Sequence, residues 1–367
     1  MMNPKNQEFV RHVLSRYYAQ AEFDIKRIDQ REFGIGNNKK IDARHLAFQT
    51  TEQLRNFLVS NCPRFVSHSA AYYRFPSATP QEKKEWLGAD LIFDLDMHSE
   101  GKYDVYHRLD EMRSEVARLI DDFLIADFGI KKDDMLVVFS GNRGYHVHVR
   151  SEDYASLGAE ERREIMNYIR GEGLNIKDLF SWEEIKGKKK IQKLIGPTPE
   201  EGGYSGRLAR LVIETLNKEP ERISRIFTKQ EKREEFINGI RQGNWSRTSL
   251  DLEELLNRLQ ELKNNLAVMT VNADPAVTYD LSKLIRVPNS IHGDTGFVAK
   301  IVNDIDTFEP MRHAVINGPS VEIVFKEDVP ALEMLNQTFG PFKANEKAEL
   351  PLGVALFFVL KESADKI

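Results

Sequence analysis

The stretch that most constrains this chain runs from residue 88 to residue 98 and reads GADLIFDLDMH. In an extended strand, successive side chains point to opposite faces, so Asp94 and Asp96 share one face while the apolar residues between and before them face a core. Two carboxylates so placed repel each other unless a proton or a cation lies between them. The pattern indicates a divalent-metal site, although an isolated Asp-x-Asp is also typical of a strand that ends in a solvated turn.

Length and composition limit the kind of protein to which these aspartates can belong. The chain has 367 residues, of which 41% are hydrophobic and 30% charged, which is typical of a globular protein with one large domain and a smaller one. The 52 basic and 57 acidic residues give a net charge of −5, so nucleic acid would have to be bound by a local basic cleft. Cys62 is the only cysteine, which excludes an internal disulfide and a cysteine-rich zinc site.

The N-terminal sequence MMNPKNQEFVRHV lacks the apolar core of a signal peptide. No stretch approaches the roughly 18 consecutive apolar residues of a membrane span. We therefore expect a cytoplasmic protein that makes no use of a membrane.

The second informative stretch, MLVVFSGNRGYHVHV at residues 135–149, predicts a β-hairpin. Two strand-like runs flank the sequence GNRG, whose glycines suit a tight reversal and let backbone N–H groups approach a ligand closely. Ser140 and Arg143 lie at the bend, and His146 and His148 share one face of the second strand. Hydroxyl, guanidinium and imidazole donors of this kind suit an anionic phosphate. Metal ligation by the two histidines is the competing hypothesis, and for His148 a structural role in the sheet is favoured.

The third stretch, VTYDLSKLIRVPNSIHGDTGFVAK at residues 277–300, places a third acid beside a further set of donors. Its proline ends the first run and predicts that the serine and histidine beyond it project from a loop. Taken alone, the stretch is compatible with a polar surface hairpin, but three stretches of complementary chemistry favour one shared site. Its candidate residues are Asp280, Lys283, Arg286, Ser290 and His292.

Helical and strand-like patterns alternate along the chain and predict a mixed α/β (α+β) fold. Apolar residues recur at helical spacing in 8–20 and in 109–128, on either side of strand-like runs. Residues 197–266 are strongly charged and mostly helical in pattern, and we interpret them as a small helical insertion domain. The remaining residues, 1–196 and 267–367, would form a discontinuous catalytic domain.

In their order, GADLIFDLD, FSGNRGYHVHV and YDLSKLIRVPNSIHGDTG resemble the catalytic (small) subunit of the archaeal and eukaryotic DNA primases. SAAYYRFP at 69–76 and LPLGVALFFVL at 350–360 extend the resemblance, which is closer to the archaeal branch. The resemblance implies the primase catalytic fold and a nucleotidyltransferase that makes short RNA or DNA primers on single-stranded DNA from nucleoside triphosphates, releasing pyrophosphate. It also implies a large primase subunit as partner and a location at replication sites.

The resemblance further implies roles for individual residues. Two ions, Mg²⁺ or Mn²⁺, would be held by Asp94, Asp96 and Asp280. The incoming triphosphate would be gripped by Ser140, Arg143 and His146 of the second motif. The third motif would add further triphosphate contacts, with the candidates Lys283, Arg286, Ser290 and His292.

The chain departs from the family pattern at two places. The family often carries a zinc knuckle after the aspartate strand, but Tyr103 and Tyr106 stand here at the spacing of a Cys-x-x-Cys. A thiolate site cannot form without cysteines, so we predict no structural zinc, which leaves open what orders this loop. Asn142 also replaces a common second arginine in the hairpin motif, which predicts weaker triphosphate affinity.

Two alternatives belong to other classes. A haloacid-dehalogenase-like phosphatase also carries an Asp-x-Asp after an apolar strand. Its chemistry wants Thr or Val two residues after the second aspartate, where this chain has His98. An inactive nucleic-acid-binding or scaffold subunit is the other alternative, and it is compatible with the missing zinc site.

Overall fold

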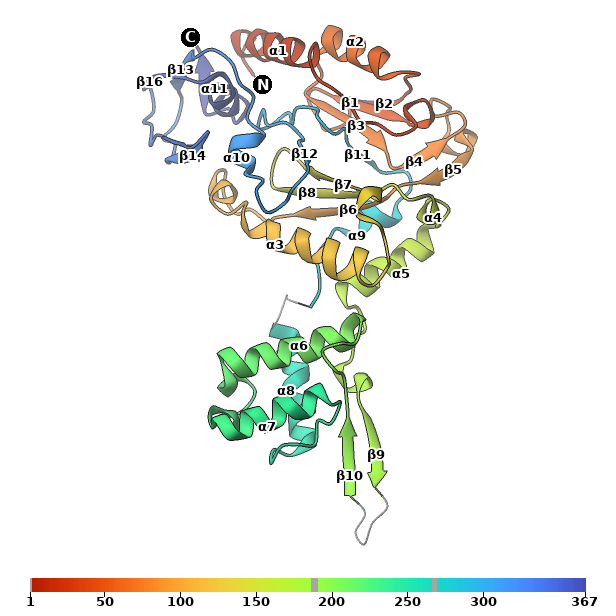
Figure 1. The fold of residues 1–367 in the computed structure, drawn as a ribbon. Helices are drawn as coiled ribbons and strands as arrows, with labels where there is room; N and C mark the ends of the chain where they lie inside the picture. Colours follow the sequence, from red (N-terminus) through yellow and green to blue (C-terminus); the bar gives the residue numbers. More distant parts are fainter. Residues whose placement is uncertain (1, 186–190, 266–268) are drawn as a thin grey trace. The chain divides into compact units, whose positions relative to one another are not determined.

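The computed structural model describes residues 2–185, 191–265 and 269–367, which form two compact units (Figure 1). The first unit carries all three sequence motifs and is built from the stretches Met1–Ala117, Ile130–Met166 and Ala273–Ile367. The second unit contains Arg118–Gly129 and Asn167–Asn272. Helices and several antiparallel sheets are combined in the chain, which confirms the predicted mixed α/β class.

The second unit is larger than the helical insertion predicted at 197–266. It contains β9 (Ser181–Ile185), β10 (Ile191–Ile195), α6 (Gly203–Lys218), α7 (Gln230–Arg241) and α8 (Leu252–Asn265). Arg207 on α6 pairs with Asp127 at 2.8 Å, and both side chains are buried. This packing draws the 118–129 segment into the unit across a long separation in sequence. The predicted boundary at 266–267 lies outside the described residues.

Two four-stranded antiparallel sheets form the centre of the first unit. One has the order β12 (Ile301–Val302), β7 (Met135–Phe139), β8 (Gly144–Val149) and β6 (Leu91–Asp96). The other has the order β11 (Leu284–Arg286), β3 (Phe65–Ser69), β1 (Phe33–Gly36) and β2 (Ala43–Leu46). The first and second motifs therefore lie on neighbouring strands of one sheet, while the third motif contributes β11 to the other sheet.

The register of β6 against β8 aligns the acids with the histidine hairpin. Asp94 lies opposite His146, and Asp96 lies opposite Gly144. Since side chains alternate along both strands, Phe93 and Val147 point to the other face, where both are fully buried. The predicted hairpin at 135–149 and its alternation are thus confirmed.

Helices cover the outer sides of these sheets. Figure 1 shows α1 (Pro4–Tyr18) and α2 (Thr51–Asn61) beyond the β1–β3 sheet, and α3 (Glu111–Arg118) and α5 (Ala159–Arg170) beyond β6–β8. α1 begins where the Asn3 side chain accepts a hydrogen bond from the Asn6 N–H, with Pro4 at the first helical position. The predicted helix at 109–128 is α3 continued by a π-helical stretch, Leu119–Ile125. Smaller elements of the unit are β4 (Ala71–Tyr73), β5 (Trp86–Ala89), α4 (Glu152–Ala155) and α9 (Pro275–Tyr279).

The C-terminal part of the first unit surrounds one apolar helix, α11 (Leu352–Leu360), whose residues after Leu352 are all buried. The other elements are α10 (Pro310–His313), β13 (Val321–Phe325), β14 (Leu332–Met334), β15 (Gln337–Phe339), β16 (Lys347–Leu350) and β17 (Ala364–Lys366). β13 pairs with both β16 and β17, while β14 and β15 form a separate hairpin. Of the helices that the structure describes, none combines the length and the apolar character needed to cross a bilayer.

The loop that would carry a zinc knuckle is ordered here by two tyrosines. Tyr106 packs edge-on against Phe357 of α11, with ring centroids 5.1 Å apart, and Tyr103 contacts the same ring at 6.2 Å. The Tyr103 hydroxyl bonds to Ser363, and the Tyr106 hydroxyl donates to Asn142 Oδ1 at 3.0 Å. The aromatic residues thus tie the loop both to α11 and to the bend of the second motif.

A buried ion pair supports the strand that carries the two aspartates. Arg31 Nη2 lies 2.5 Å from Asp90 Oδ2, with side-chain exposures of 1% and 2%. We expect Asp90→Ala to lower the free energy of unfolding by about 3–5 kcal/mol, because it leaves the Arg31 guanidinium buried without its counter-charge. Urea denaturation followed by circular dichroism measures this loss. The control Asp24→Ala removes an exposed partner of Arg150 and should cost below about 1 kcal/mol, so equal losses would contradict the prediction.

Candidate functional site

A single cavity of about 540 Å³ in the first unit collects every predicted site residue except Ser290. It is bordered by the ends of β6 and β8, by β11, and by the turn between β1 and β2. The three motifs, far apart in sequence, therefore meet at one place. The predicted residues that line the cavity are Asp94, Asp96, Ser140, Arg143, His146, Asp280, Lys283, Arg286 and His292.

Asp94 lies at the centre of the negative charge in this cavity. Burial, followed by the nearby charges of Asp96 and Asp274, raises the pKa of the Asp94 carboxyl to about 7. The backbone N–H of Asp274 donates to the Asp94 carbonyl at 2.8 Å, which holds these two residues side by side. A carboxylate with so high a pKa is stabilised in its charged form by a cation, so this environment favours cation binding.

The acids are not clustered tightly enough to form a ready metal site. Among the residues that the structure describes, no three His, Cys, Asp or Glu side chains are grouped so as to hold a metal ion. Asp96 is paired with Arg143, whose Nη2 lies 2.6 Å from Asp96 Oδ2. Asp280 Oδ1 accepts hydrogen bonds from the Ser282 N–H at 2.9 Å and the Ser282 hydroxyl at 2.7 Å. Asp96 is therefore paired with an arginine, and the hydrogen bonds that Asp280 accepts from described residues all go to its Oδ1.

Glycines allow the second motif to pack tightly against its neighbours. Gly141 has φ +80°, and a Cβ there would lie 2.8 Å from the Cβ of His292. At Gly144 a Cβ would lie 1.8 Å from the carbonyl oxygen of Leu95, so no larger residue fits. Ser140 Oγ accepts weak hydrogen bonds from the N–H groups of Asn142 and Gly144. The bend is thus held directly against both the aspartate strand and the third motif.

Three nitrogen atoms around the cavity have no partner within the described part of the chain, and all three are buried from solvent. Arg143 Nε and Arg286 Nη1 are donors, whereas His146 Nδ1 donates in one tautomer and accepts in the other. Burial lowers the pKa of Arg286 to about 10, so it stays cationic near neutral pH. Burial lowers the pKa of His146 to about 3, so this imidazole is neutral and acts as a hydrogen-bonding group. Unpaired buried donors are costly, and a set of them around one cavity indicates an acidic ligand.

The third motif is only partly as expected. His292 lines the cavity, but it is buried, and its Nδ1 accepts the Asp294 N–H at 3.2 Å. The prediction for Ser290 is wrong: this fully buried side chain donates to the Val287 carbonyl at 2.7 Å and does not line the cavity. A serine two residues after a proline readily closes such a local turn, and sequence spacing does not reveal in which direction its hydroxyl points.

His148 lies away from the cavity lining. It is buried beside His68, with ring centroids 6.1 Å apart, and burial holds the pKa of His148 well below its ordinary value. The structural role favoured from the sequence fits this position.

Three charged residues of the lining were not predicted from the sequence: Asp274, Lys40 and Arg44. Asp274 caps α9, because its Oδ1 accepts the Ala276 N–H at 2.9 Å, and its Oδ2 lies 3.7 Å from Lys283 Nζ. The Asp-Pro pair at 274–275 is a recognisable helix start, but helix capping gives no hint of a role in a site. Lys40 lies in the turn between β1 and β2, and Arg44 lies on β2. The pairing of these two strands brings both residues to the cavity, and that pairing could not be predicted from local sequence.

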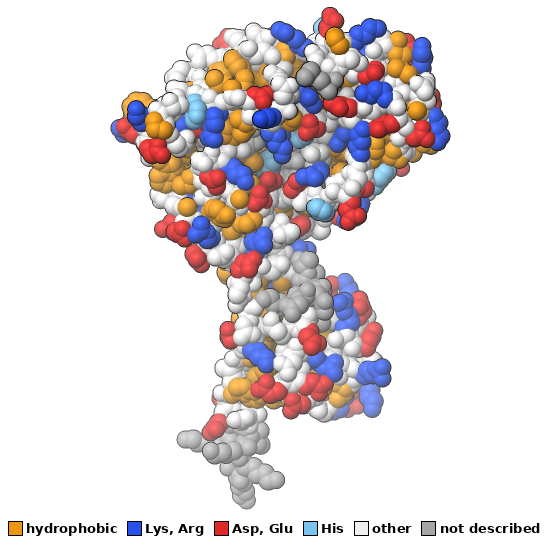
Figure 2. Space-filling view, turned by 180° about the vertical axis from the view of Figure 1, so that it is seen from behind, with side chains coloured by type: hydrophobic (Ala, Val, Ile, Leu, Met, Phe, Trp, Pro, Cys, Tyr) orange, Lys and Arg blue, Asp and Glu red, His pale blue; other side chains and the backbone are white. Residues whose placement is uncertain are grey.

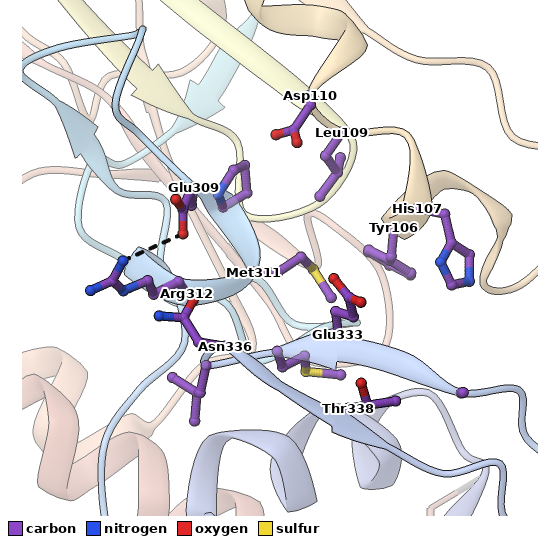
Figure 3. Close-up of a pocket in the computed structure, with 14 residues that line it drawn as sticks. Tyr106, His107, Leu109, Asp110, Glu309, Met311, Arg312, Glu333, Asn336 and Thr338 are labelled. Carbon is purple, nitrogen blue, oxygen red and sulfur yellow. Dashed lines mark ion pairs between the residues drawn. The ribbon is translucent and has the colours of Figure 1, made fainter.

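A different cavity, of about 510 Å³, lies between the 106–110 segment, α10 and the β14–β15 hairpin (Figure 3). Figure 3 shows the carboxylates of Asp110, Glu309 and Glu333 around it, and Arg312 pairs with Glu309 at 3.6 Å. Acidic groups outnumber basic ones in this lining, which disfavours a phosphate ligand. The described residues that form it include none of the predicted site residues.

The face of the molecule shown in Figure 2 has no broad region of one charge that would guide an anionic ligand. On the face shown in Figure 2, acidic and basic side chains are interspersed. This agrees with the net charge of −5. An anionic ligand would therefore be recognised by local groups such as those of the 540 Å³ cavity.

Comparison with known proteins gives one consistent result. A family model for the DNA primase small subunit matches residues 93–304. The DNA primase small subunit PriS of Methanocella arvoryzae is 33% identical, with 99% of each chain covered. PriS of Pyrobaculum islandicum is 32% identical over 94% of this chain and 95% of its own, and PriS of Methanothrix thermoacetophila is 30% identical over 99% and 100%. The resemblance drawn from the three motifs is confirmed, and the chain belongs to the DNA primase small subunit family.

Proposed function

We propose that this chain is the catalytic subunit of a DNA primase, which makes short RNA or DNA primers on single-stranded DNA. The reaction is a nucleotidyl transfer from nucleoside triphosphates that releases pyrophosphate. The observation that carries the proposal is one cavity that places carboxylates, among them Asp94 with its raised pKa, beside arginine and imidazole nitrogens that have no partner among the described residues. Family membership supports the same function, and the fact that the relatives are named small subunits supports a large subunit as partner.

The donor chemistry of the cavity fits Mg²⁺ or Mn²⁺. Carboxylate oxygens are the ligands that these ions prefer, and the high pKa of Asp94, about 7, indicates an excess of negative charge that a cation relieves. Asp94, Asp96 and Asp280 would hold two such ions, with Asp274 close enough to add to the field. When bound, such ions lower the pKa of an attacking 3′-hydroxyl and offset charge on the α-phosphate and the leaving pyrophosphate.

The protein's own residues would hold the triphosphate without repelling a bound cation. Arg143 pairs with Asp96, so an ion at Asp96 would release its guanidinium toward the phosphates. Arg286 offers a fixed positive charge, whereas neutral His146 and His292 offer hydrogen bonds without adding repulsion to a bound cation. Because His146 and His292 are already buried in the lining, little reorganisation of these two side chains is needed when substrate binds.

Primer synthesis on a single-stranded DNA template tests the proposal directly. The purified chain, alone and with its large subunit, is incubated with labelled nucleotides and Mg²⁺ or Mn²⁺, and products are separated by length. We expect short labelled oligomers. Absence of product under both conditions would favour the scaffold alternative, and release of phosphate from a generic phosphomonoester would favour the phosphatase alternative.

Arg143→Ala should raise the KM for nucleoside triphosphate by about 10-fold to 100-fold, because it removes a charged donor to the phosphates. Steady-state primer synthesis at varied nucleotide concentration measures the change. Arg143→Lys, which keeps the charge but loses the planar fork, should give an intermediate KM. An unchanged KM in Arg143→Ala would count against the triphosphate role.

A further inference from the structure

A cavity of about 750 Å³ lies on another part of the first unit and shares no lining residue with the catalytic cavity. One wall is a single face of α1, with side chains at helical spacing from Phe9 to Tyr17, and Gln20 follows just beyond the end of the helix. The opposite wall is formed by Asn289, Val298 and Lys300 of the third motif and by the segment from His313 to Val321. Its size falls within the range of small-molecule binding sites.

The charge of this cavity is opposite to that of the whole chain. Arg16, Lys300 and Lys366 line it together with two histidines, whereas Glu22 is the only acidic side chain among the described lining residues. No described residue forms an ion pair with Arg16 or Lys300, and both side chains are exposed. In a chain with net charge −5, a local excess of cationic side chains without ion-pair partners among the described residues favours an anionic ligand.

The rest of the lining suits a ligand with a flat ring. The aromatic side chains of Phe9 and Tyr17 lie on the α1 wall, and apolar residues such as Val298 and Ile316 lie opposite. Asn289 Oδ1 is buried without a hydrogen-bond partner, while its Nδ2 donates to the Glu22 carbonyl at 2.9 Å. A buried acceptor of this kind seeks a donor such as the exocyclic amino group of a base.

We propose that this cavity binds a nucleoside phosphate, with its phosphates on Arg16 and Lys300 and its base against Phe9 and Tyr17. The site is separate from the catalytic cavity, but one segment joins them. Arg286 and His292 line the catalytic cavity, while Asn289 and Lys300, a few residues away along the same segment, line the second one. A nucleotide bound there would contact Asn289 and Lys300 of the third motif, neither of which lines the catalytic cavity.

Equilibrium dialysis of the full chain with labelled ATP in EDTA tests the proposal, since divalent ions are then unavailable to the catalytic cavity. We expect binding that survives in Arg143→Ala/Arg286→Ala and weakens at least tenfold in Arg16→Ala/Lys300→Ala. The matched control Lys5→Ala/Lys131→Ala removes the same charge from exposed positions outside the cavity and should bind as the unaltered chain. Lys300→Glu alone is a second variant at an exposed position and should weaken binding at least as much as Lys300→Ala.

Phe9→Ala distinguishes a nucleotide from a simple anion. It should weaken ATP several-fold and leave binding of inorganic tripolyphosphate unchanged. Equal affinities of Arg16→Ala/Lys300→Ala and its control would overturn the site, and tripolyphosphate competing as strongly as ATP in the unaltered chain would overturn the nucleotide assignment. If the chain makes no primers but still binds ATP in EDTA, the proposed function is wrong and this inference stands. If it makes primers but does not bind ATP in EDTA, this inference is wrong and the proposed function stands.

Discussion

Asp94→Asn should abolish primer synthesis, lowering kcat by about a thousandfold or more. The substitution keeps the size of the side chain but removes the charge that would hold a cation beside the reacting phosphate. Cation stabilisation of developing charge contributes several kcal/mol, and each 1.36 kcal/mol is about tenfold in rate. Labelled-nucleotide incorporation on a single-stranded template measures the loss.

The same variant should be more stable than the unaltered chain when no divalent ion is present. Burial and the neighbouring charges of Asp96 and Asp274 raise the pKa of Asp94 to about 7, far above the value of an unfolded aspartate. The folded state therefore binds this proton more tightly than the unfolded state. The stability that the proton contributes is fully present below the unfolded pKa of about 4, and it is lost as pH rises from there through the folded pKa of about 7. We expect Asp94→Asn to raise Tm by a few degrees in EDTA at pH 8. The gain should shrink steadily as pH falls from about 7 toward about 4, because Asp94 then becomes protonated in the unfolded chain as well as in the folded one.

A matched control separates these effects from a general change in charge. Asp110→Asn removes an exposed carboxylate outside the catalytic cavity and should leave both primer synthesis and Tm close to unchanged. If Asp94→Asn keeps full activity with both Mg²⁺ and Mn²⁺, the role of Asp94 in metal binding is wrong. If it is inactive but unfolded by circular dichroism, the result says nothing about chemistry, and the Tm measurement detects that case.

Features set by local sequence were predicted correctly. The aspartate strand and the glycine hairpin follow from alternation and from turn residues, which act over a few positions. The alignment of Asp94 with His146 depends on strand pairing, yet it follows once both strands share a sheet, since register is fixed by which face is buried.

Features set by long-range packing could not be predicted in this way. Whether Ser290 faces the cavity depends on a turn closed by its own hydroxyl, and the extent of the second unit depends on Arg207 reaching Asp127. Asp274 was missed because a helix cap and a site residue carry the same sequence signal. Tyr103 and Tyr106 could not be assigned a partner, because α11 lies about 250 residues further along the chain.

The second large effect concerns which acid joins Asp94 and Asp96 in binding the cations. Asp280→Asn should lower the kcat of primer synthesis about a hundredfold or more, whereas Asp274→Asn should retain most activity at pH 8. Asn at 280 can still accept the hydrogen bonds from Ser282, so only the charge is lost. Asn at 274 remains a good helix cap, so α9 should persist.

Loss of the Asp274 charge should lower the pKa of Asp94, because that charge contributes to its elevation after burial and Asp96. Asp94 would then be ionised at lower pH, and the acid limb of the pH profile of primer synthesis should move to lower pH in Asp274→Asn. Measuring kcat between pH 5.5 and pH 8.5 for both variants decides between the two acids. If Asp274→Asn is inactive and Asp280→Asn is active, Asp274 at the start of α9 is the acid that joins Asp94 and Asp96. The prediction of Asp280, at the end of α9, would then be wrong.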